Sequence, residues 1–189
     1  MVNADYKDKD LIVNILAKSF QDNKSVNYIT KEDQKKGWRI KALMEYSFDL
    51  CYLFGNVFLT DDKKGCALVL LPDKKRTTLQ SILLDIKLIV SCIDIFNIKK
   101  VMEREAAIKK LQSHGLKYYL WFIGVKPEEQ NKGIGTILLK EIIKEAEERN
   151  RLVCLETSTE KNIPWYKKFG FEIYNELNLG YRLYFMKKG

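Results

Sequence analysis

Apolar residues recur along the chain with two spacings, one typical of helices and one typical of strands. Apolar positions three or four residues apart, as on an amphipathic helix, occur in the segments 10–20, 31–53, 79–96, 99–112 and 134–150. Continuous runs of aliphatic and aromatic residues, typical of buried strands, occur at 56–60, 66–71, 118–124 and 152–155. This mixture predicts an α/β fold of the α+β kind.

The beginning of the chain carries weaker signals. Residues 1–6 show only a faint strand pattern, and the polar segment 21–27 predicts a loop. Asp10 is the expected N-cap of the first helix, since its side chain can accept a hydrogen bond from a backbone N–H of the first turn.

Turn residues between the strand runs predict two antiparallel hairpins. The segment 61–65 joins the first two runs, and Pro72 ends the second of them because proline cannot donate to a β-ladder. Near the end of the chain, segments 172–176 and 179–186 form the other expected hairpin, which completes the sheet.

The segment 79–96 is dense in isoleucine and leucine, but Asp85, Lys87 and Asp94 interrupt it. No uninterrupted run approaches the roughly 18 apolar residues that a membrane span needs, so we expect no membrane partner. We predict instead an apolar helix packed on the sheet. Its excess apolar surface would also suit an acceptor pocket or a homodimer interface.

Composition suits one domain with a sizeable core. The chain has 189 residues, 46% of them hydrophobic, and no Ser-, Gly- or Pro-rich linker divides it, so we expect a single domain over residues 1–189. The net charge of +8 is spread over short lysine clusters and is not gathered in a recognisable nucleic-acid-binding motif. A basic, solvated surface without a nucleic-acid partner is therefore expected.

Cysteine and histidine usage argues against metal and covalent-nucleophile chemistry. The four cysteines form no Cys-x-x-Cys pair, and Cys66 and Cys154 lie inside apolar runs, as core thiols do. His114 is the single histidine and follows a charged helical segment, so a surface position at a helix end is expected. We expect no metal and, since no signal peptide opens the chain, a reducing, cytoplasmic location.

The stretch from Val125 to Thr136 joins the aromatic strand run to an amphipathic helix and contains Gly133 and Gly135. A glycine turn at a helix start presents backbone N–H groups that no helical carbonyl accepts, and the helix dipole there favours a phosphate. An ordinary strand-to-helix turn is the alternative. A Walker loop is absent, and Leu138 stands where a dinucleotide fingerprint needs its third glycine.

The pattern that fits is Gln/Arg-x-x-Gly-x-Gly/Ala, formed by Gln130, Gly133 and Gly135, and it resembles the acetyl-CoA signature of the GNAT superfamily of N-acetyltransferases. A second stretch, 162–171, is similar to that family's other landmark, a short helix with Asn and Tyr that ends in Gly-Phe. A helix and a strand lie between the two, as the family has them. The resemblance is good from about Tyr118 onward and covers the first half only in outline.

The resemblance implies a GNAT-type fold, a mixed and mostly antiparallel sheet flanked by helices and splayed beside the signature loop. It implies transfer of an acetyl group from acetyl-CoA to a primary amine by direct attack in a ternary complex. The acceptor, a small-molecule or peptide amine, is not readable from the sequence. A non-catalytic CoA-binding module of the same fold is the alternative function.

The resemblance also carries roles to individual residues. The implied cofactor-binding positions are Ile123, Val125, Gln130, Asn131, Lys132, Gly133, Ile134, Gly135, Thr136 and Asn162. The first two would pair with pantetheine amides through their backbone while packing in the core. The loop from Asn131 to Thr136 would bind the pyrophosphate through its N–H groups, and Asn162 would bind the cofactor arm or cap a helix.

Two catalytic positions are expected. Tyr166 matches the family's general acid for the CoA thiolate, with a buried structural aromatic as the alternative. Glu156, at the end of the strand run 152–155, is the candidate general base. Thr157 and Ser158 are polar alternatives that could only position a water molecule.

Overall fold

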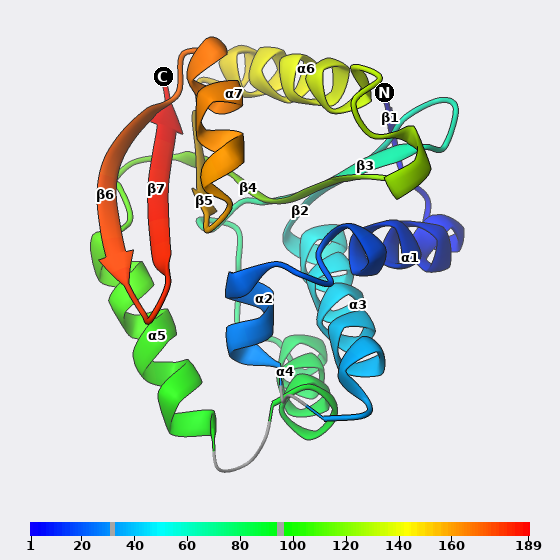
Figure 1. Ribbon diagram of the computed structural model, residues 1–189, viewed down its shortest axis with the longest axis vertical. Helices are drawn as coiled ribbons and strands as arrows, with labels where there is room; N and C mark the ends of the chain where they lie inside the picture. The colour runs from blue at the N-terminus through cyan, green and yellow to red at the C-terminus, as the bar shows by residue number, and fades with distance from the viewer. Residues whose placement is uncertain (31–32, 94–96) are drawn as a thin grey trace.

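In the computed structural model, which describes residues 1–30, 33–93 and 97–189, a seven-stranded sheet runs through the molecule (Figure 1). Its order is β1-β2-β3-β4-β5-β7-β6. The strands are β1 (Val2–Asn3), β2 (Gly55–Leu59), β3 (Gly65–Leu70), β4 (Lys117–Val125), β5 (Leu152–Thr157), β6 (Glu172–Asn178) and β7 (Arg182–Lys188). Only β4 and β5 pair in parallel, so the predicted mixed, mostly antiparallel sheet is confirmed.

Helices cover both faces of this sheet. The helices are α1 (Lys9–Ser19), α2 (Lys24–Ile29), α3 (Lys36–Phe54), α4 (Leu79–Ser91), α5 (Ile98–Leu111), α6 (Ile134–Glu148) and α7 (Ile163–Lys168). Short 3-10 turns lie at η1 (Tyr6–Asp8), η3 (Pro127–Glu129) and η4 (Glu160–Asn162). Figure 1 shows α6 and α7 on one side of the sheet and α1, α3 and α4 on the other, with α5 beside the β6–β7 hairpin.

The core is divided by the sheet because successive side chains of a strand point to opposite faces. Along β3, Cys66 and Leu68 pack in the cluster shared with α1 and α3, while Ala67 and Val69 pack in the cluster shared with α6. Every residue of β3 is buried. The central strand is therefore covered on both sides, and its continuous apolar run reflects this.

The structure corrects several sequence-based predictions near the N-terminus. Helix α1 begins at Lys9 with Asp8 as its N-cap, so Asp10 lies inside the first turn. The predicted loop 21–27 contains the start of α2. Asn23 caps this helix, since its side-chain oxygen accepts hydrogen bonds from the N–H groups of Ser25 and Val26.

The sequence predicted that the apolar helix α4 packs on the sheet. This prediction is wrong, because α4 packs against α3 on the outside of the molecule (Figure 1). Several of its large apolar side chains face solvent: Leu79, Ile82, Leu83, Ile86 and Val90. The predicted helix 79–96 is observed to Ser91, and residues 94–96 lie outside the described residues. No helix in the described residues is long and apolar enough to cross a membrane.

The buried stripe of α6 also differs from the one that its spacing predicts. Apolar residues four apart from Ile134 predict a face of Leu138, Ile142 and Ala146 with Ile137 beside it, but Ile137 is 55% exposed. The residues that pack on the sheet are Leu138, Leu139, Ile142, Ile143 and Ala146. The helix is therefore turned so that positions 139 and 143, which the i+4 pattern did not include, complete the core.

Two leucine substitutions test this division between core and surface. Leu138 is fully buried and Leu83 is 67% exposed. We expect Leu138→Ala to lower the free energy of unfolding by about 2–5 kcal/mol because it leaves a cavity, and Leu83→Ala by less than about 1 kcal/mol. Urea denaturation measures both. Equal losses would contradict the observed packing of α4 and α6.

Candidate functional site

The site lies where two parallel strands separate. Strands β4 and β5 pair only between residues 117–119 and 152–154. Beyond Tyr119, β4 runs on to Val125 and β5 runs on to Thr157 without pairing with each other in the described part of the chain. The sheet therefore opens into a V-shaped gap between these strands.

A β-bulge in β4 lies at the start of the gap. Leu68 of β3 is opposite Phe122 and Val69 is opposite Leu120, so Trp121 has no partner in β3. An extra residue bends a strand and increases its twist. It also shifts the alternation of side chains, and Trp121 and Phe122 both pack against the core cluster of α1 and α3. The bulge thus turns two aromatic rings to the same face of the sheet.

The backbone of β4 presents free groups along the gap. The Lys126 N–H donates to the Lys64 carbonyl at 2.9 Å. Because hydrogen-bonding groups alternate along an antiparallel ladder, the peptide groups of Ile123 and Val125 face away from β3, toward the gap. The Val125 carbonyl there accepts hydrogen bonds from Ser19 Oγ at 2.9 Å and Gln130 Nε2 at 3.3 Å.

The signature loop follows this strand directly and leaves a run of donors unused. Gly133 is the N-cap of α6 with φ of 85°, and Asn131 has φ of 64°, both in the left-handed region. Within the described part of the chain, the N–H groups from Asn131 to Thr136 donate no hydrogen bond to any protein acceptor. These donors stand at the positive end of the α6 dipole, which suits a phosphate.

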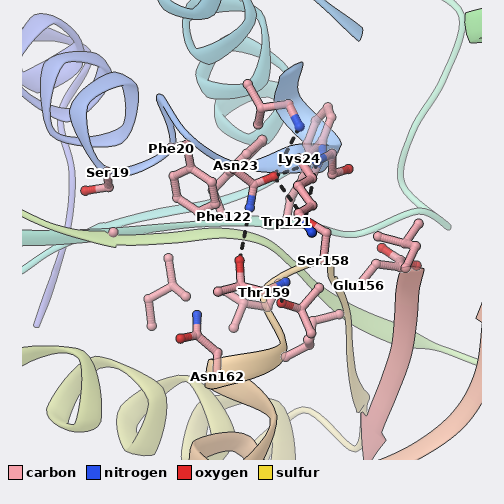
Figure 2. A pocket seen from close by; sticks show the side chains of 18 of the residues that line it. Ser19, Phe20, Asn23, Lys24, Trp121, Phe122, Glu156, Ser158, Thr159 and Asn162 are labelled. Atoms are coloured by element: carbon pink, nitrogen blue, oxygen red, sulfur yellow. Dashed lines mark hydrogen bonds between the residues drawn. The ribbon is translucent and has the colours of Figure 1, made fainter. Parts of the chain in front are cut away.

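A cavity of about 1640 Å³ connects the loop with both sides of the gap. On the α6–α7 side it is lined by the loop glycines, Asn162, Trp165 and Tyr166. On the other side it reaches the aromatic residues Phe20, Trp121 and Phe122, as Figure 2 shows. A polar bridge crosses between these halves, where Asn23 Nδ2 donates to Thr159 Oγ1 at 3.4 Å (Figure 2).

Tyr166 is buried in α7 and also lines the cavity. Its ring packs against Trp165 and Phe171, with ring centroids 4.7 Å and 5.6 Å away. Burial raises the pKa of this phenol, and no hydrogen bond or charge within the described residues contributes to the shift. The group is therefore protonated at neutral pH, which makes it a hydrogen-bond donor and not a base.

Asn162 lines the cavity at the N-cap position of α7, but its side chain makes no capping hydrogen bond there. The amide is also without another partner in the described residues. Asn162 thus takes the N-cap position that the alternative gave it, but it makes no capping hydrogen bond, and its side chain is left with its donors and acceptor unused (Figure 2). Pro164 lies in the first turn of this helix, and Gly170, with φ of 83°, follows its end.

Glu156 lies in β5 and is held by two donors. The Tyr119 hydroxyl and Gln112 Nε2, the latter at 2.9 Å, donate hydrogen bonds to its two carboxylate oxygens. Burial raises the pKa of this carboxyl above its usual value, although both hydrogen bonds act in the opposite direction. No salt bridge neutralises the Glu156 carboxylate within the described residues. A desolvated carboxylate of this kind can accept a proton from an amine.

The polar alternatives to Glu156 have structural partners. Thr157 Oγ1 accepts a hydrogen bond from the Thr159 N–H at 3.1 Å. Ser158 Oγ donates to Asn23 Oδ1 at 3.4 Å and accepts from the Ser25 N–H at 3.3 Å. These two side chains therefore fasten the end of β5 to the start of α2.

Trp165 and Tyr119 contribute to the site but were not singled out from the sequence. Trp165 Nε1 donates to Thr136 Oγ1 at 3.2 Å and ties α7 to the first turn of α6. A Cβ added at Gly135 would lie 3.7 Å from the Trp165 ring. The position of Trp165 next to Tyr166 was the available signal. For Tyr119 no signal existed, because its contact with Glu156 joins residues far apart in the chain.

The cysteines and the histidine singled out from the sequence are not part of this site. Cys66 and Cys154 are buried, as predicted, and His114 is exposed beyond the end of α5. Among the described residues no group of three or more His, Cys, Asp or Glu side chains is arranged to hold a metal ion.

Comparison with known proteins gives a family match over part of the chain. A model of the acetyltransferase (GNAT) domain matches residues 90–173, which include the signature loop, Glu156 and Tyr166. A structure described as histone acetyltransferase HPA2 and related acetyltransferase from Corynebacterium glutamicum superposes with a TM-score of 0.70 and 16% identity. The match covers 99% of this chain and 93% of that one.

Two further solved structures have the same fold. The C-terminal condensation domain of Ebony, in complex with β-alanyl-dopamine, gives a TM-score of 0.72 with 10% identity over 99% of this chain and 96% of that one. Arabidopsis thaliana Naa50, in complex with a CoA-containing bisubstrate analogue, gives 0.53 with 14% identity over 100% and 94%. At these identities the similarity shows the fold, which is the GNAT type expected from the sequence.

The raised pKa of Glu156 predicts a specific dependence of stability on pH. The folded state keeps this proton at pH values where the unfolded chain, with a pKa of about 4.3, has lost it. The contribution of Glu156 to stability therefore falls as pH rises from about 4.3 through the higher folded value. Between pH 4 and pH 7, the wild type should lose stability relative to Glu156→Gln.

Urea denaturation at several pH values measures this difference. Glu128→Gln, which changes an exposed carboxylate in the same way, is the matched control and should follow the wild type. A wild type that gains stability relative to Glu156→Gln over this range would contradict a desolvated carboxyl at the gap.

Proposed function

Because the chain has the fold of the GNAT acetyltransferases and carries their domain over residues 90–173, we propose that it transfers the acetyl group of acetyl-CoA to a primary amine. The observation that carries this proposal is the run of unused N–H groups from Asn131 to Thr136 beside the free edge of β4. An ordinary strand-to-helix turn would not require these donors to face a cavity.

The residues present fit acetyl-CoA as co-substrate. The N–H groups of Asn131, Gly133 and the first turn of α6 would hold the pyrophosphate, with Lys132 and Gln130 beside it. The Ile123 peptide groups and the Val125 N–H, which face the gap, would pair with the pantetheine amides as an added strand would, whereas the Val125 carbonyl is already bonded to Ser19 and Gln130. The unused Asn162 amide would bind the same arm. Trp165 would keep Thr136 and α6 in place.

The proposed reaction is attack of the neutral amine on the thioester carbonyl, which forms the C–N bond and breaks the C–S bond. Glu156 accepts the proton that the amine loses, directly or through a water molecule, and Tyr166 donates a proton to the departing thiolate. Direct transfer is favoured because neither of the cysteines in the strand runs is an activated nucleophile. Burial raises the pKa of the Cys154 thiol, and that of Cys66 far more, so neither thiol is ionised at neutral pH.

A single domain over residues 1–189, a cytoplasmic location and a homodimer remain predictions. The exposed apolar stripe of α4 supports the last of these, since such a stripe on a soluble surface often marks an interface.

Acetyl-CoA binding is the first test. We expect acetyl-CoA to raise the melting temperature, because a ligand that binds only the folded state stabilises it by about 2.7 kcal/mol at one hundred times its Kd. Gly135→Trp, which places a large side chain against the Trp165 ring at the loop, should abolish this shift. Gly37→Trp is the control, since a Cβ at Gly37 meets nothing within 4 Å. A shift that survives Gly135→Trp would place the binding elsewhere.

Tyr166→Phe separates an enzyme from a CoA-binding module of the same fold. For an enzyme, we expect kcat to fall by about 10²–10⁴-fold, because the thiolate loses its proton donor, with little change in acetyl-CoA affinity. A thiol-release assay with amine acceptors measures the rate, and calorimetry measures the affinity. Tyr184→Phe, a second buried tyrosine, is the matched control. A folded wild type that binds acetyl-CoA but releases no thiol with any amine would support the binding module.

A further inference from the structure

The half of the cavity on the α1–α3 side has an aromatic wall that the signature loop does not explain. Its rings form a continuous set, with Tyr119 and Tyr46 lying 6.4 Å and 6.2 Å from Trp121, Phe122 at 5.8 Å from Trp121, and Phe20 at 5.0 Å from Phe122. Aliphatic side chains complete this wall: Val26, Ile29, Leu43, Leu88, Val101 and Ile108. Such a surface binds a ligand with an apolar body.

The Glu156 carboxylate makes no ion pair in the described residues and is held by two neutral donors where the aromatic wall meets the gap. The buried Arg104 forms its own ion pair with Glu105 and acts on the pKa of Glu156 without a direct contact. A cationic amine that approaches along the wall would pair with Glu156 directly. Exposed Lys24 and Lys109 lie at the rim together with the acidic Asp22, Glu105 and Glu160, so the apolar wall and not the rim charge opposes a second cationic group on the ligand.

Side-chain contacts join helix α2 to the elements on either side of it. Helix α2 lies between the end of β5 and the turn of the β6–β7 hairpin. At one end Asn23 and Ser25 hold residues 158–159, as described above, and at the other the Tyr28 ring packs edge-to-face on Tyr181 with centroids 5.5 Å apart. Arg104 joins both, since Nη2 donates to Ser25 Oγ at 2.5 Å and Nε to the Tyr181 hydroxyl at 3.2 Å.

These contacts bridge α2 to β5, α5 and the β6–β7 hairpin. A polypeptide that passed between α2 and the hairpin would have to separate the buried Arg104 from its partners, and breaking such hydrogen bonds is costly. A compact molecule needs no such change, because the aromatic wall already lines the 1640 Å³ cavity.

We propose that the acceptor is a small primary amine with a compact aromatic body, which packs on Trp121 and directs its amino group to the Glu156–Tyr119 pair. This inference rests on the proposed acetyl transfer and specifies its substrate class. Trp121 would determine specificity, and Tyr119 would position Glu156 without contacting the thioester.

The experiment measures thiol release from acetyl-CoA with 2-phenylethylamine, spermidine and a tetrapeptide that has a free N-terminus. We expect kcat/KM for 2-phenylethylamine to exceed that for the other two by at least about tenfold, since apolar contacts of this size discriminate by that order. Higher activity with the peptide would show that the contacts of α2 do not exclude a polypeptide, and higher activity with spermidine would overturn the role of the apolar wall. Absence of transfer to every amine would instead refute the proposed function.

Matched tryptophan variants test the role of the wall. Trp121→Leu should raise KM for 2-phenylethylamine by about tenfold and leave KM for acetyl-CoA unchanged, because the ring contacts only the acceptor. Trp38→Leu removes a tryptophan that is 55% exposed on α3 and does not line the cavity, and both constants should stay as in the wild type. Thermal stabilisation by acetyl-CoA shows that each variant is folded. An unchanged amine KM in a folded Trp121→Leu would refute the assignment.

Discussion

The separation of β4 from β5 is the constraint on which the rest of the site depends. Parallel strands normally pair along their length, and here the pairing stops after Tyr119. Beyond that point each strand has backbone groups that the other would have used, and burying them unpaired would be unfavourable. The gap is stable because β4 is bonded to β3 on its other side and β5 to β7 on its own. The sheet thus holds an opening at its centre without losing its continuity.

The polar groups on the two sides of this opening differ in whether they have hydrogen-bond partners within the protein. On the α6 side, the loop N–H groups and the Asn162 amide keep no protein partner in the described residues. On the α2 side, Asn23, Ser25 and Arg104 use their hydrogen-bonding groups on neighbouring elements. Unsatisfied donors suit a polar ligand that comes and goes, whereas satisfied ones fix the wall around it. The two halves of the cavity therefore differ in how far their polar groups are satisfied within the protein.

The sequence predicted the features that are encoded locally. The strand and helix around the signature loop follow from residue spacing, and Gly133 and Gly170 take the left-handed backbone expected of glycine at such turns. The features that it did not reveal depend on contacts between distant residues. The bulge at Trp121 is defined only by its register with β3, and the Tyr119–Glu156 pair joins strands separated by α6. The packing of α4 on the sheet was predicted wrongly because an apolar pattern shows that a helix face is suited to burial but does not identify the surface that buries it.

The order of strands has a consequence for synthesis on the ribosome. Residues 182–188 form β7, which lies between β5 and the earlier-made β6. Until those residues leave the exit tunnel, β5 presents a bare edge that can recruit a foreign strand. During this time β6 has no neighbouring strand to pair with, because β7 is its partner in the sheet. The nascent chain would therefore be most vulnerable to aggregation in the interval between completion of Glu156 and emergence of its last strand, which makes this interval the natural point for chaperone engagement.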